Sequence, residues 1–255
     1  MPTAVITGAA QGLGLVTARR FADAGFRVVL TDIQPLDAAL ADLAGAGHTA
    51  IGVSGDIASE AFVAGLAARV DVDCGGADVL VNNAGVSFIC PAEETSFDQW
   101  RRVNAINLDG PFLLCRAFGR QMLARRQGAI VNVASVAGTG GVIHRSAYNA
   151  SKHGLIGLTR TLAAEWGGRG VRVNAVCPGW IKTEMDERDM GSGAYSNADI
   201  VNRVPMARFA EPGDVAAAIL FLARDASFVN GVALPVDGGW SSDASWDALR
   251  LKTRA

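Results

Sequence analysis

The sequence lacks any stretch in which basic residues gather. It carries 23 Lys and Arg residues against 25 Asp and Glu residues, for a formal net charge of -2 at pH 7. Proteins that bind DNA or RNA generally present a basic patch or stripe to the phosphate backbone. Nucleic acid is therefore not predicted as a partner.

Long apolar runs are also missing. The longest covers Val215–Ala223, which is far shorter than the roughly 20 residues that a membrane-spanning helix needs. The chain passes from Met1 almost directly into a strand-like segment, which leaves no space for a secretory signal. These absences predict a soluble, cytoplasmic protein with no membrane partner.

Cysteine and aromatic residues are scarce. The cysteines at positions 74, 90, 115 and 177 are widely separated and form no C-x-x-C pair. This spacing favours reduced thiols over a disulfide framework or a zinc site, so no metal is expected. The simplest interpretation is that all four are small buried apolar side chains. With aromatics at 7%, the core must consist mainly of Ala, Val, Leu and Ile, which suits a sheet buried on both faces.

Short runs of β-branched residues alternate with helical stretches rich in Ala and Leu. The strand candidates are Thr3–Thr7, Arg27–Thr31, Thr49–Val53, Val79–Val81, Ala129–Val133, Val171–Val176 and Val232–Val236. The helix candidates are Leu13–Ala24, Leu36–Ala46, Glu60–Val70, Phe97–Arg126, Ala147–Trp166 and Pro212–Ala223. Such alternation predicts β-α-β units with right-handed crossovers. The expected fold is a doubly wound α/β domain, with a seven-stranded parallel sheet and helices on both faces.

We expect one domain over residues 1–255, because no repeat, low-complexity tract or Pro/Gly-rich linker divides the chain. Ligands of such sheets bind beyond the carboxyl ends of the strands, near the point where strand order reverses. Chemistry is therefore expected after strands one, four, five and six. Residues 184–211 are polar and lack a strong period, which is typical of a substrate lid or a disordered segment. Residues 241–255 form a C-terminal tail.

A glycine-rich segment, Thr7–Gly14, joins the first strand to the first helix with the spacing G-x-x-x-G-x-G. Glycines let the backbone approach a pyrophosphate closely, and the helix N-terminus offers free N–H groups and a favourable dipole. Taken alone, the pattern also fits a plain tight turn, but its place at the start of a β-α-β unit favours dinucleotide binding. No Gly-Lys-Ser/Thr follows, so a P-loop that binds ATP is not predicted.

Asp32 ends the second strand, 18 residues after Gly14. An acidic residue at about this spacing hydrogen-bonds a ribose 2′-OH, and its charge repels a 2′-phosphate. No Lys or Arg adjoins it, because Ile33, Gln34 and Pro35 follow. The pattern predicts NAD rather than NADP as the cofactor. The alternative is an aspartate that only caps a helix or a turn.

Tyr148 and Lys152 lie four residues apart, so they share one face of a predicted helix. A free tyrosine has a pKa of about 10 and is mostly neutral at pH 7. A nearby cation favours its phenolate, which can exchange a proton with an alcohol or a carbonyl. Ser135 follows the fifth strand, where its hydroxyl could hold the substrate oxygen or merely cap a turn.

These motifs occur in an order that resembles the short-chain dehydrogenase/reductase family, whose fold is a Rossmann domain. The resemblance runs from Thr7 to Gly239 and includes the glycine segment, Asp56, Asn82-Asn83-Ala84-Gly85, Asn107, Ser135, Tyr148, Lys152, Pro178-Gly179 and Asp237-Gly238-Gly239. It implies a catalytic tetrad of Asn107, Ser135, Tyr148 and Lys152. In that tetrad Tyr148 is the acid/base and Ser135 positions the reacting oxygen. Lys152 binds the nicotinamide ribose and lowers the pKa of the tyrosine.

The same resemblance assigns the cofactor contacts. Asp56 and Ile57 are expected to meet the adenine, Asn82 to Gly85 to pass beneath the cofactor, and Ile181 and Thr183 to hold the carboxamide. The predicted cofactor-binding residues are Gly8, Gln11, Gly12, Leu13, Gly14, Asp32, Ile33, Asp56, Ile57, Asn83, Ala84, Gly85, Tyr148, Lys152, Pro178, Gly179, Ile181 and Thr183.

Asn107 also has a physical interpretation. Pro111 has no N–H, so in a continuous helix the Asn107 carbonyl would lose its usual partner. By resemblance to the family, that carbonyl could hold a water that relays protons from Lys152 to solvent. The competing interpretation is that Gly110-Pro111 simply ends a helix.

The substrate is expected over the nicotinamide, and its predicted contacts are Ser135, Val142, His144, Tyr148, Trp180 and Met185. Val142, Trp180 and Met185 suggest an apolar wall, whereas His144 could meet a polar group or lie in a surface loop. The leading hypothesis is an NAD-dependent dehydrogenase or ketoreductase that acts on a secondary alcohol or its ketone. The alternatives are a 3-oxoacyl-thioester reductase and a non-catalytic NAD-binding sensor. The family resemblance implies a homotetramer or a homodimer.

Overall fold

A parallel sheet forms the centre of the structure, a computed structural model that describes residues 1–182 and 195–252. The strands are β1 (Thr3–Thr7), β2 (Arg27–Asp32), β3 (Ala50–Ser54), β4 (Val79–Asn82), β5 (Gly128–Val133), β6 (Val171–Pro178) and β7 (Ala233–Val236). They lie in the order β3-β2-β1-β4-β5-β6-β7, and every neighbouring pair is parallel. β2 and β3 lie on one side of β1, and β4 to β7 lie on the other, so the strand order reverses at β1. The predicted doubly wound fold with seven strands is confirmed.

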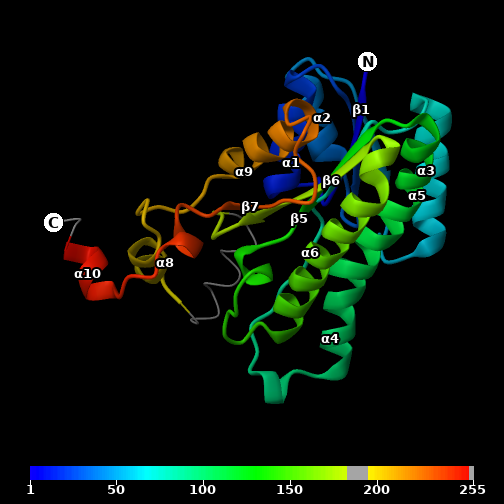
Figure 1. The fold of residues 1–255 in the computed structure, drawn as a ribbon. Coiled ribbons are helices and arrows are strands. Elements are labelled where there is room, and N and C mark those ends of the chain that lie inside the picture. Colours follow the sequence, from blue (N-terminus) through cyan, green and yellow to red (C-terminus); the bar gives the residue numbers. More distant parts are fainter. Residues whose placement is uncertain (183–194, 253–255) are drawn as a thin grey trace.

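Helices cover both faces of this sheet (Figure 1). One face carries α1 (Gly12–Asp23), α2 (Asp37–Gly45) and α9 (Pro212–Leu220), and the other carries α3 (Glu60–Cys74), α5 (Gly110–Arg125) and α6 (Ser146–Trp166). The described residues also form α4 (Phe97–Asn104), α8 (Asn197–Arg203) and α10 (Asp247–Lys252). Short 3₁₀ turns occur at Ala92–Glu94, Val136–Gly138, Gly167–Arg169 and Trp240–Ser242.

The strands are mainly apolar because both faces of the sheet are covered. Along β1, Ala4 and Ile6 pack into the core beside α1 and α9, whereas Val5 packs into the core beside α3 and α5. All three side chains are fully buried. Side chains alternate between the two faces of a strand, so a parallel sheet with helices on both sides requires a nearly continuous apolar run.

One helical path runs from Phe97 to Arg125, with a π-helical turn at Ala105–Asp109. In that turn the N–H of Gly110 donates to the carbonyl of Ala105, one residue further than in an α-helix. Pro111 follows as the second residue of α5, and it offers no N–H to the carbonyls of the preceding turn. Gly110-Pro111 therefore does not end the helix, and the competing interpretation of this dipeptide is wrong.

Two segments in which the sequence predicts no helix contain short helices. Residues 195–211 include α8, which begins with a capping box between Ser196 and Asp199. The tail includes α10, and residues 184–194 lie outside the described part of the chain. Helices this short are missed because they hold too few residues to show an apolar period. Within residues 1–182 and 195–252, no helix combines the length and the apolar character needed to cross a membrane.

Candidate active site

The glycine segment forms a tight loop at the end of β1. Gly8 (φ 65°) and Gly12 (φ 55°) adopt left-handed backbone conformations, which glycine reaches without strain. A Cβ on Gly14 would lie 2.0 Å from the carbonyl oxygen of Gly8, so no side chain fits there. Helix α1 starts at Gly12, and Gln11 at its N-cap makes no side-chain capping bond. The loop and the helix N-terminus can therefore offer backbone N–H groups to a pyrophosphate.

Thr7 and Asn83 join this loop to the end of β4. The Thr7 Oγ1 accepts hydrogen bonds from the N–H groups of Asn83 (3.0 Å) and Ala84 (2.9 Å). The Asn83 Nδ2 donates to the carbonyls of Thr7 (2.9 Å) and Gly8 (3.1 Å). The predicted segment from Asn83 to Gly85 therefore lies against the glycine loop, where strand order reverses. Sequence reasoning missed Thr7, and its place as the last residue of β1 is the signal that could have found it.

Asp32 is fixed beside the same loop. Its Oδ2 accepts the N–H of Ala10 and its Oδ1 accepts the N–H of Gln34, both at 3.0 Å. A carboxylate oxygen has two acceptor positions, so each oxygen can still accept a bond from a ligand. Ile33 beside it is 66% exposed. The ends of β1 and β2 thus hold a negative charge next to a loop suited to phosphate.

The two residues that follow β3 differ in what they can offer to an adenine ring. Asp56 is exposed, and its Oδ1 accepts the N–H of Ala58 at 2.9 Å. The Ile57 side chain is only 5% exposed and belongs to the core beside α3 and α5. Asp56 therefore lies at the surface of the site, whereas the Ile57 side chain is directed into the core.

Lys152 and Tyr148 lie together on α6. The Lys152 Nζ donates to the carbonyl of Val133 at 2.8 Å and lies 5.5 Å from the ring centroid of Tyr148. Lys152 is only 4% exposed, and its burial lowers the pKa of its ammonium from 10.5 to about 8. Burial also raises the pKa of Cys177, a neighbouring thiol, to about 11. At neutral pH the lysine therefore supplies a poorly screened positive charge beside the phenol, and the thiol stays neutral.

Asn107 connects the loop after β4 to α6. Its Oδ1 accepts the N–H of Val86 at 2.9 Å, and its Nδ2 donates to the Val86 carbonyl at 2.9 Å and to the Ser151 Oγ at 3.2 Å. The Ser151 hydroxyl in turn donates to the carbonyl of Tyr148 at 2.8 Å. Both amide hydrogens of Asn107 are thus used within the protein. A proton relay would have to use its main-chain carbonyl, and that role stays a prediction.

Gly85 shows how closely these groups approach one another. A Cβ built on Gly85 would lie 3.3 Å from the Asn107 Oδ1 and 3.5 Å from the Lys152 Nζ. The structure therefore brings the end of β4, the π-helical turn and α6 into one cluster. Sequence reasoning did not select Ser151, which no motif marks and which only the contact between α6 and the π-helical turn makes visible.

Ser135 lies two residues beyond the carbonyl that holds Lys152. It is 9% exposed, and its Oγ accepts the N–H of Ala137 at 3.1 Å, which caps a 3₁₀ turn. That turn packs on α6, since a Cβ on Gly138 would lie 2.9 Å from the carbonyl oxygen of Lys152. Ser135 therefore does cap a turn, and the same turn lies against α6, the helix that carries Lys152.

The remaining predicted residues comprise cofactor contacts at and beyond the end of β6 and contacts to the substrate. Pro178 ends β6, Gly179 packs on the backbone of Asp237, and Ile181 forms a bridge with Ala210. His144, by contrast, is exposed with φ 58°, and its carbonyl accepts the N–H of Cys90 at 2.8 Å. Val142 and Trp180 are half-buried. Thr183 and Met185 lie outside the described residues.

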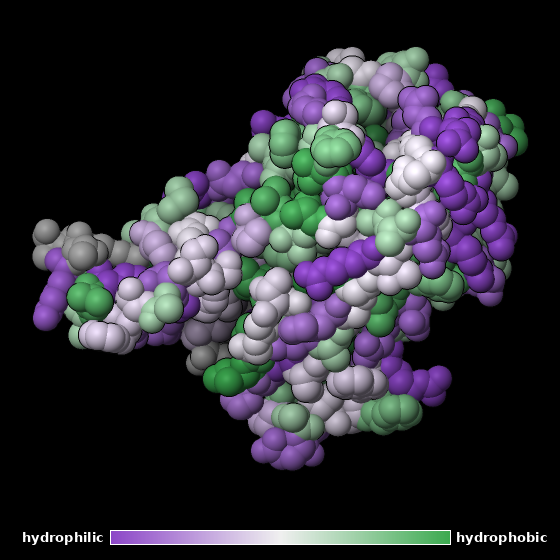
Figure 2. Space-filling model, viewed as in Figure 1, coloured by the Kyte–Doolittle hydropathy of each residue, from purple (hydrophilic) through white to green (hydrophobic). Residues whose placement is uncertain are grey.

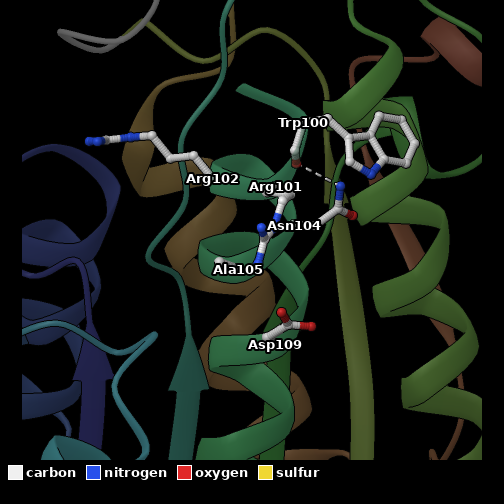
Figure 3. Close-up of a pocket in the computed structure, with 6 residues that line it drawn as sticks. All are labelled: Trp100, Arg101, Arg102, Asn104, Ala105 and Asp109. Atoms are coloured by element: carbon white, nitrogen blue, oxygen red, sulfur yellow. Dashed lines mark hydrogen bonds between the residues drawn. The ribbon is translucent and has the colours of Figure 1, made fainter. Parts of the chain in front are cut away.

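A separate hollow of about 350 Å³ lies along α4 and the π-helical turn (Figure 3). Its lining residues are Trp100, Arg101, Arg102, Asn104, Ala105 and Asp109. None of these is a predicted site residue, so the hollow is distinct from the glycine loop and the Tyr148–Lys152 pair. Across residues 1–182 and 195–252, no group of three or more His, Cys, Asp or Glu side chains is arranged to hold a metal ion.

Comparison with known proteins identifies the family. A family model described as enoyl-(acyl carrier protein) reductase matches residues 8–241. D-threitol dehydrogenase of Mycolicibacterium smegmatis is 42% identical over 241 residues, which cover 93% of this chain and 92% of that protein. Galactitol 2-dehydrogenase (L-tagatose-forming) of Cereibacter sphaeroides is 42% identical over 93% of this chain and 94% of its own length.

A solved structure supports the same conclusion. It comes from Beutenbergia cavernae, is provisionally described as an NAD(P)-dependent gluconate 5-dehydrogenase, and contains NADP at low occupancy. The TM-score is 0.88 at 40% identity, over 95% of this chain and 97% of that one. The chain belongs to the short-chain dehydrogenase/reductase family. It is an oxidoreductase that transfers a hydride between a nicotinamide cofactor and a secondary alcohol or ketone.

Proposed function

We propose that this chain is an NAD-preferring dehydrogenase whose catalytic residues are Asn107, Ser135, Tyr148 and Lys152. The observation that carries this proposal is the buried Lys152 ammonium, held by the carbonyl of Val133 at 2.8 Å and lying 5.5 Å from the ring of Tyr148. A cation beside a phenol favours the phenolate. The oxidation of an alcohol requires a group that accepts the hydroxyl proton, and a stabilised phenolate can do this.

The proposed mechanism divides the proton steps among this chain's own residues. The nicotinamide supplies the hydride acceptor when bound. Ser135 holds the substrate hydroxyl, and Tyr148 takes its proton as the carbon is oxidised. Lys152 stabilises the phenolate and holds the nicotinamide ribose. The main-chain carbonyl of Asn107 would hold a water molecule, through which the released proton leaves Lys152 for solvent.

We assign the preference for NAD to Asp32. Its carboxylate is held beside the glycine loop by the N–H groups of Ala10 and Gln34. A ribose 2′-OH can donate to that carboxylate, whereas a 2′-phosphate would face its negative charge. A similar protein from Beutenbergia cavernae contains NADP, so members of the family differ in their cofactor. We therefore attribute the NAD preference of this chain to the residues at the end of β2.

The substrate class we propose is an open-chain polyol or the corresponding hydroxyketone. Two relatives with 42% identity, a D-threitol dehydrogenase and a galactitol 2-dehydrogenase, support this class. A screen of NADH absorbance should cover polyols, sugar acids, cyclic alcohols and a 3-oxoacyl thioester, with NAD and NADP in parallel. We expect turnover of a polyol with NAD. Turnover of the thioester alone, or binding of NAD without any turnover, would contradict the proposal.

The affinity for NAD should depend on the charge of Lys152. Its pKa in the free protein is about 8, and the charged ammonium is a much stronger donor to the nicotinamide ribose than the neutral amine. The dissociation constant of NAD should therefore rise by up to about tenfold between pH 7 and pH 9, as the ammonium loses its proton. Isothermal titration would measure this change, and Lys152→Met should show a flat profile. A wild-type constant that does not change over this range would refute the role of Lys152.

We also propose that the protein is a cytoplasmic homotetramer, with α5 and α6 packed against a second copy. Phe112 on α5 is 45% exposed and Trp100 on α4 is 38% exposed, and such large apolar side chains are typical of interfaces between subunits. All four cysteines are free thiols, as is usual in a reducing compartment.

A further inference from the structure

Trp240 connects the C-terminal segment to the edge of the active site. Its ring centroid lies 4.2 Å from that of Trp180, with 34° between the two planes. The Arg203 guanidinium carbon lies 4.5 Å from the Trp240 centroid. Aromatic pairs and cation–aromatic contacts at these distances are attractive. We call Trp180, Trp240 and Arg203 the tryptophan–arginine cluster.

The sheet brings the two tryptophans together. β6 and β7 are neighbours, and beyond their paired residues the N–H of Gly179 donates to the carbonyl of Val236 at 3.1 Å. The chain then turns at Gly239, which has φ 91°. The Asp237 carboxylate holds this turn by accepting the N–H groups of Gly239 and Ser241, each at 2.9 Å. Trp180 and Trp240 therefore start from adjacent strand ends, and the turn folds one ring over the other.

Hydrogen bonds from two arginines, one of which also forms an ion pair, hold the cluster from its other side. Arg203, on α8, donates to the carbonyls of Trp240 (3.0 Å) and Asp243 (3.2 Å). Arg250, on α10, is only 7% exposed and donates to the Asp243 carboxylate at 2.9 Å and to the Asn202 carbonyl at 2.7 Å. Hydrogen bonds from Ser245 and Arg250 lower the pKa of Asp243 to about 2. An arginine is rarely so buried unless it is paired.

These contacts matter because α8 and α10 project away from the sheet. Figure 1 shows both helices beyond the ends of β6 and β7, and the space-filling view shows the same region as a lobe beside the main body (Figure 2). The tryptophan–arginine cluster thus connects this lobe to the ends of β6 and β7, and the Arg250–Asp243 pair joins α10 to the segment that follows Trp240.

We propose that Trp240 is a positioning residue for the substrate, because it fixes the ring of Trp180 as a wall for the carbon chain of a polyol. This inference rests on the proposed function. An indole offers a large apolar face, which suits the C–H side of a polyol while its hydroxyl groups meet polar partners. The C-terminal segment Trp240–Lys252 then determines how tightly a polyol binds, and it does not touch the reacting atoms.

Steady-state kinetics of Trp240→Ala test this role. We expect the KM for the best polyol to rise about tenfold. The substitution removes one aromatic contact, and the ring of Trp180 is then no longer held in one orientation. The kcat and the KM for NAD should stay within about twofold of wild type, because the lost interaction affects ground state and transition state alike. Trp240→Phe keeps an aromatic face toward Trp180 and Arg203, and it should restore most of the polyol affinity.

A matched control and a spectroscopic measurement make the test specific. Trp246 lies in the same segment and is 71% exposed, so Trp246→Ala should leave all kinetic constants unchanged. Two stacked indoles give an exciton couplet in circular dichroism, which Trp240→Ala should remove and Trp246→Ala should retain. The inference fails if Trp240→Ala behaves like Trp246→Ala, if kcat falls while KM does not change, or if the couplet survives. If wild type oxidises no polyol, the proposed function itself fails.

Discussion

Tyr148→Phe is expected to lower kcat by at least about 10²-fold, the usual contribution of a positioned acid/base. The substitution removes only the phenolic oxygen, so the ring stays beside the Lys152 ammonium, 5.5 Å from its centroid. NAD should still bind, because the glycine loop and Asp32 do not change. The measurement is turnover of the best polyol by absorbance, together with the dissociation constant of NAD by titration calorimetry.

Two further results decide whether the loss is chemical. Wild-type turnover should depend on pH through its acid/base, and the residual rate of Tyr148→Phe should lose that dependence. A primary isotope effect from deuterium on the oxidised carbon should appear or increase in the variant if proton transfer and hydride transfer are coupled. Turnover of Tyr148→Phe within about threefold of wild type would be too small a change for an acid/base and would exclude Tyr148 from that role.

The second large effect concerns cofactor preference. Asp32→Asn should reduce kcat/KM for NAD about 10- to 100-fold, since hydrogen bonds to a charged group contribute about 1.5–3 kcal/mol. The same substitution should raise kcat/KM for NADP, because it removes the negative charge that repels a 2′-phosphate. Asparagine retains one acceptor oxygen, so the bond to either Ala10 or Gln34 can persist. The ratio of kcat/KM values for NAD and NADP is the quantity to measure.

A positive charge added next to position 32 should shift the cofactor preference further toward NADP. Ile33 is 66% exposed next to Asp32, so an arginine at this position can reach a phosphate without displacing core side chains. Asp32→Asn with Ile33→Arg is expected to prefer NADP outright. Asp37→Asn removes the same charge from the exposed first turn of α2 and should leave the preference unchanged. If Asp37→Asn changes the ratio of kcat/KM values for NAD and NADP as much as Asp32→Asn does, the preference would come from the overall charge of this region and not from Asp32.

Several features of the fold could be predicted because they depend on short stretches of chain. The predicted strand Thr3–Thr7 matches β1 residue for residue, and the helix predicted from Ala147 to Trp166 starts one residue earlier in α6. Buried parallel strands are apolar runs bounded by polar turns, and amphipathic helices repeat every few residues. Both signals lie within a window of about a dozen residues.

Other features depend on contacts that such a window does not contain. The π-helical turn at Ala105–Asp109 interrupts a helix predicted as continuous, and within it Asn107 bonds to Val86 and Ser151, which lie on other elements. A short helix such as α8 likewise shows no clear period. These details follow from packing, which local propensity does not specify.

The sequence by itself determined the class of protein and the order of strands and helices, and it supplied the side chains that we propose for the chemistry. Only the tertiary structure decided that the Lys152 ammonium lies buried against the carbonyl of Val133 and that Asp32 turns toward the glycine loop. It also brought Trp240 onto Trp180. The physical reason is that burial and charge depend on strand pairing and helix packing, which bring together residues from distant parts of the chain.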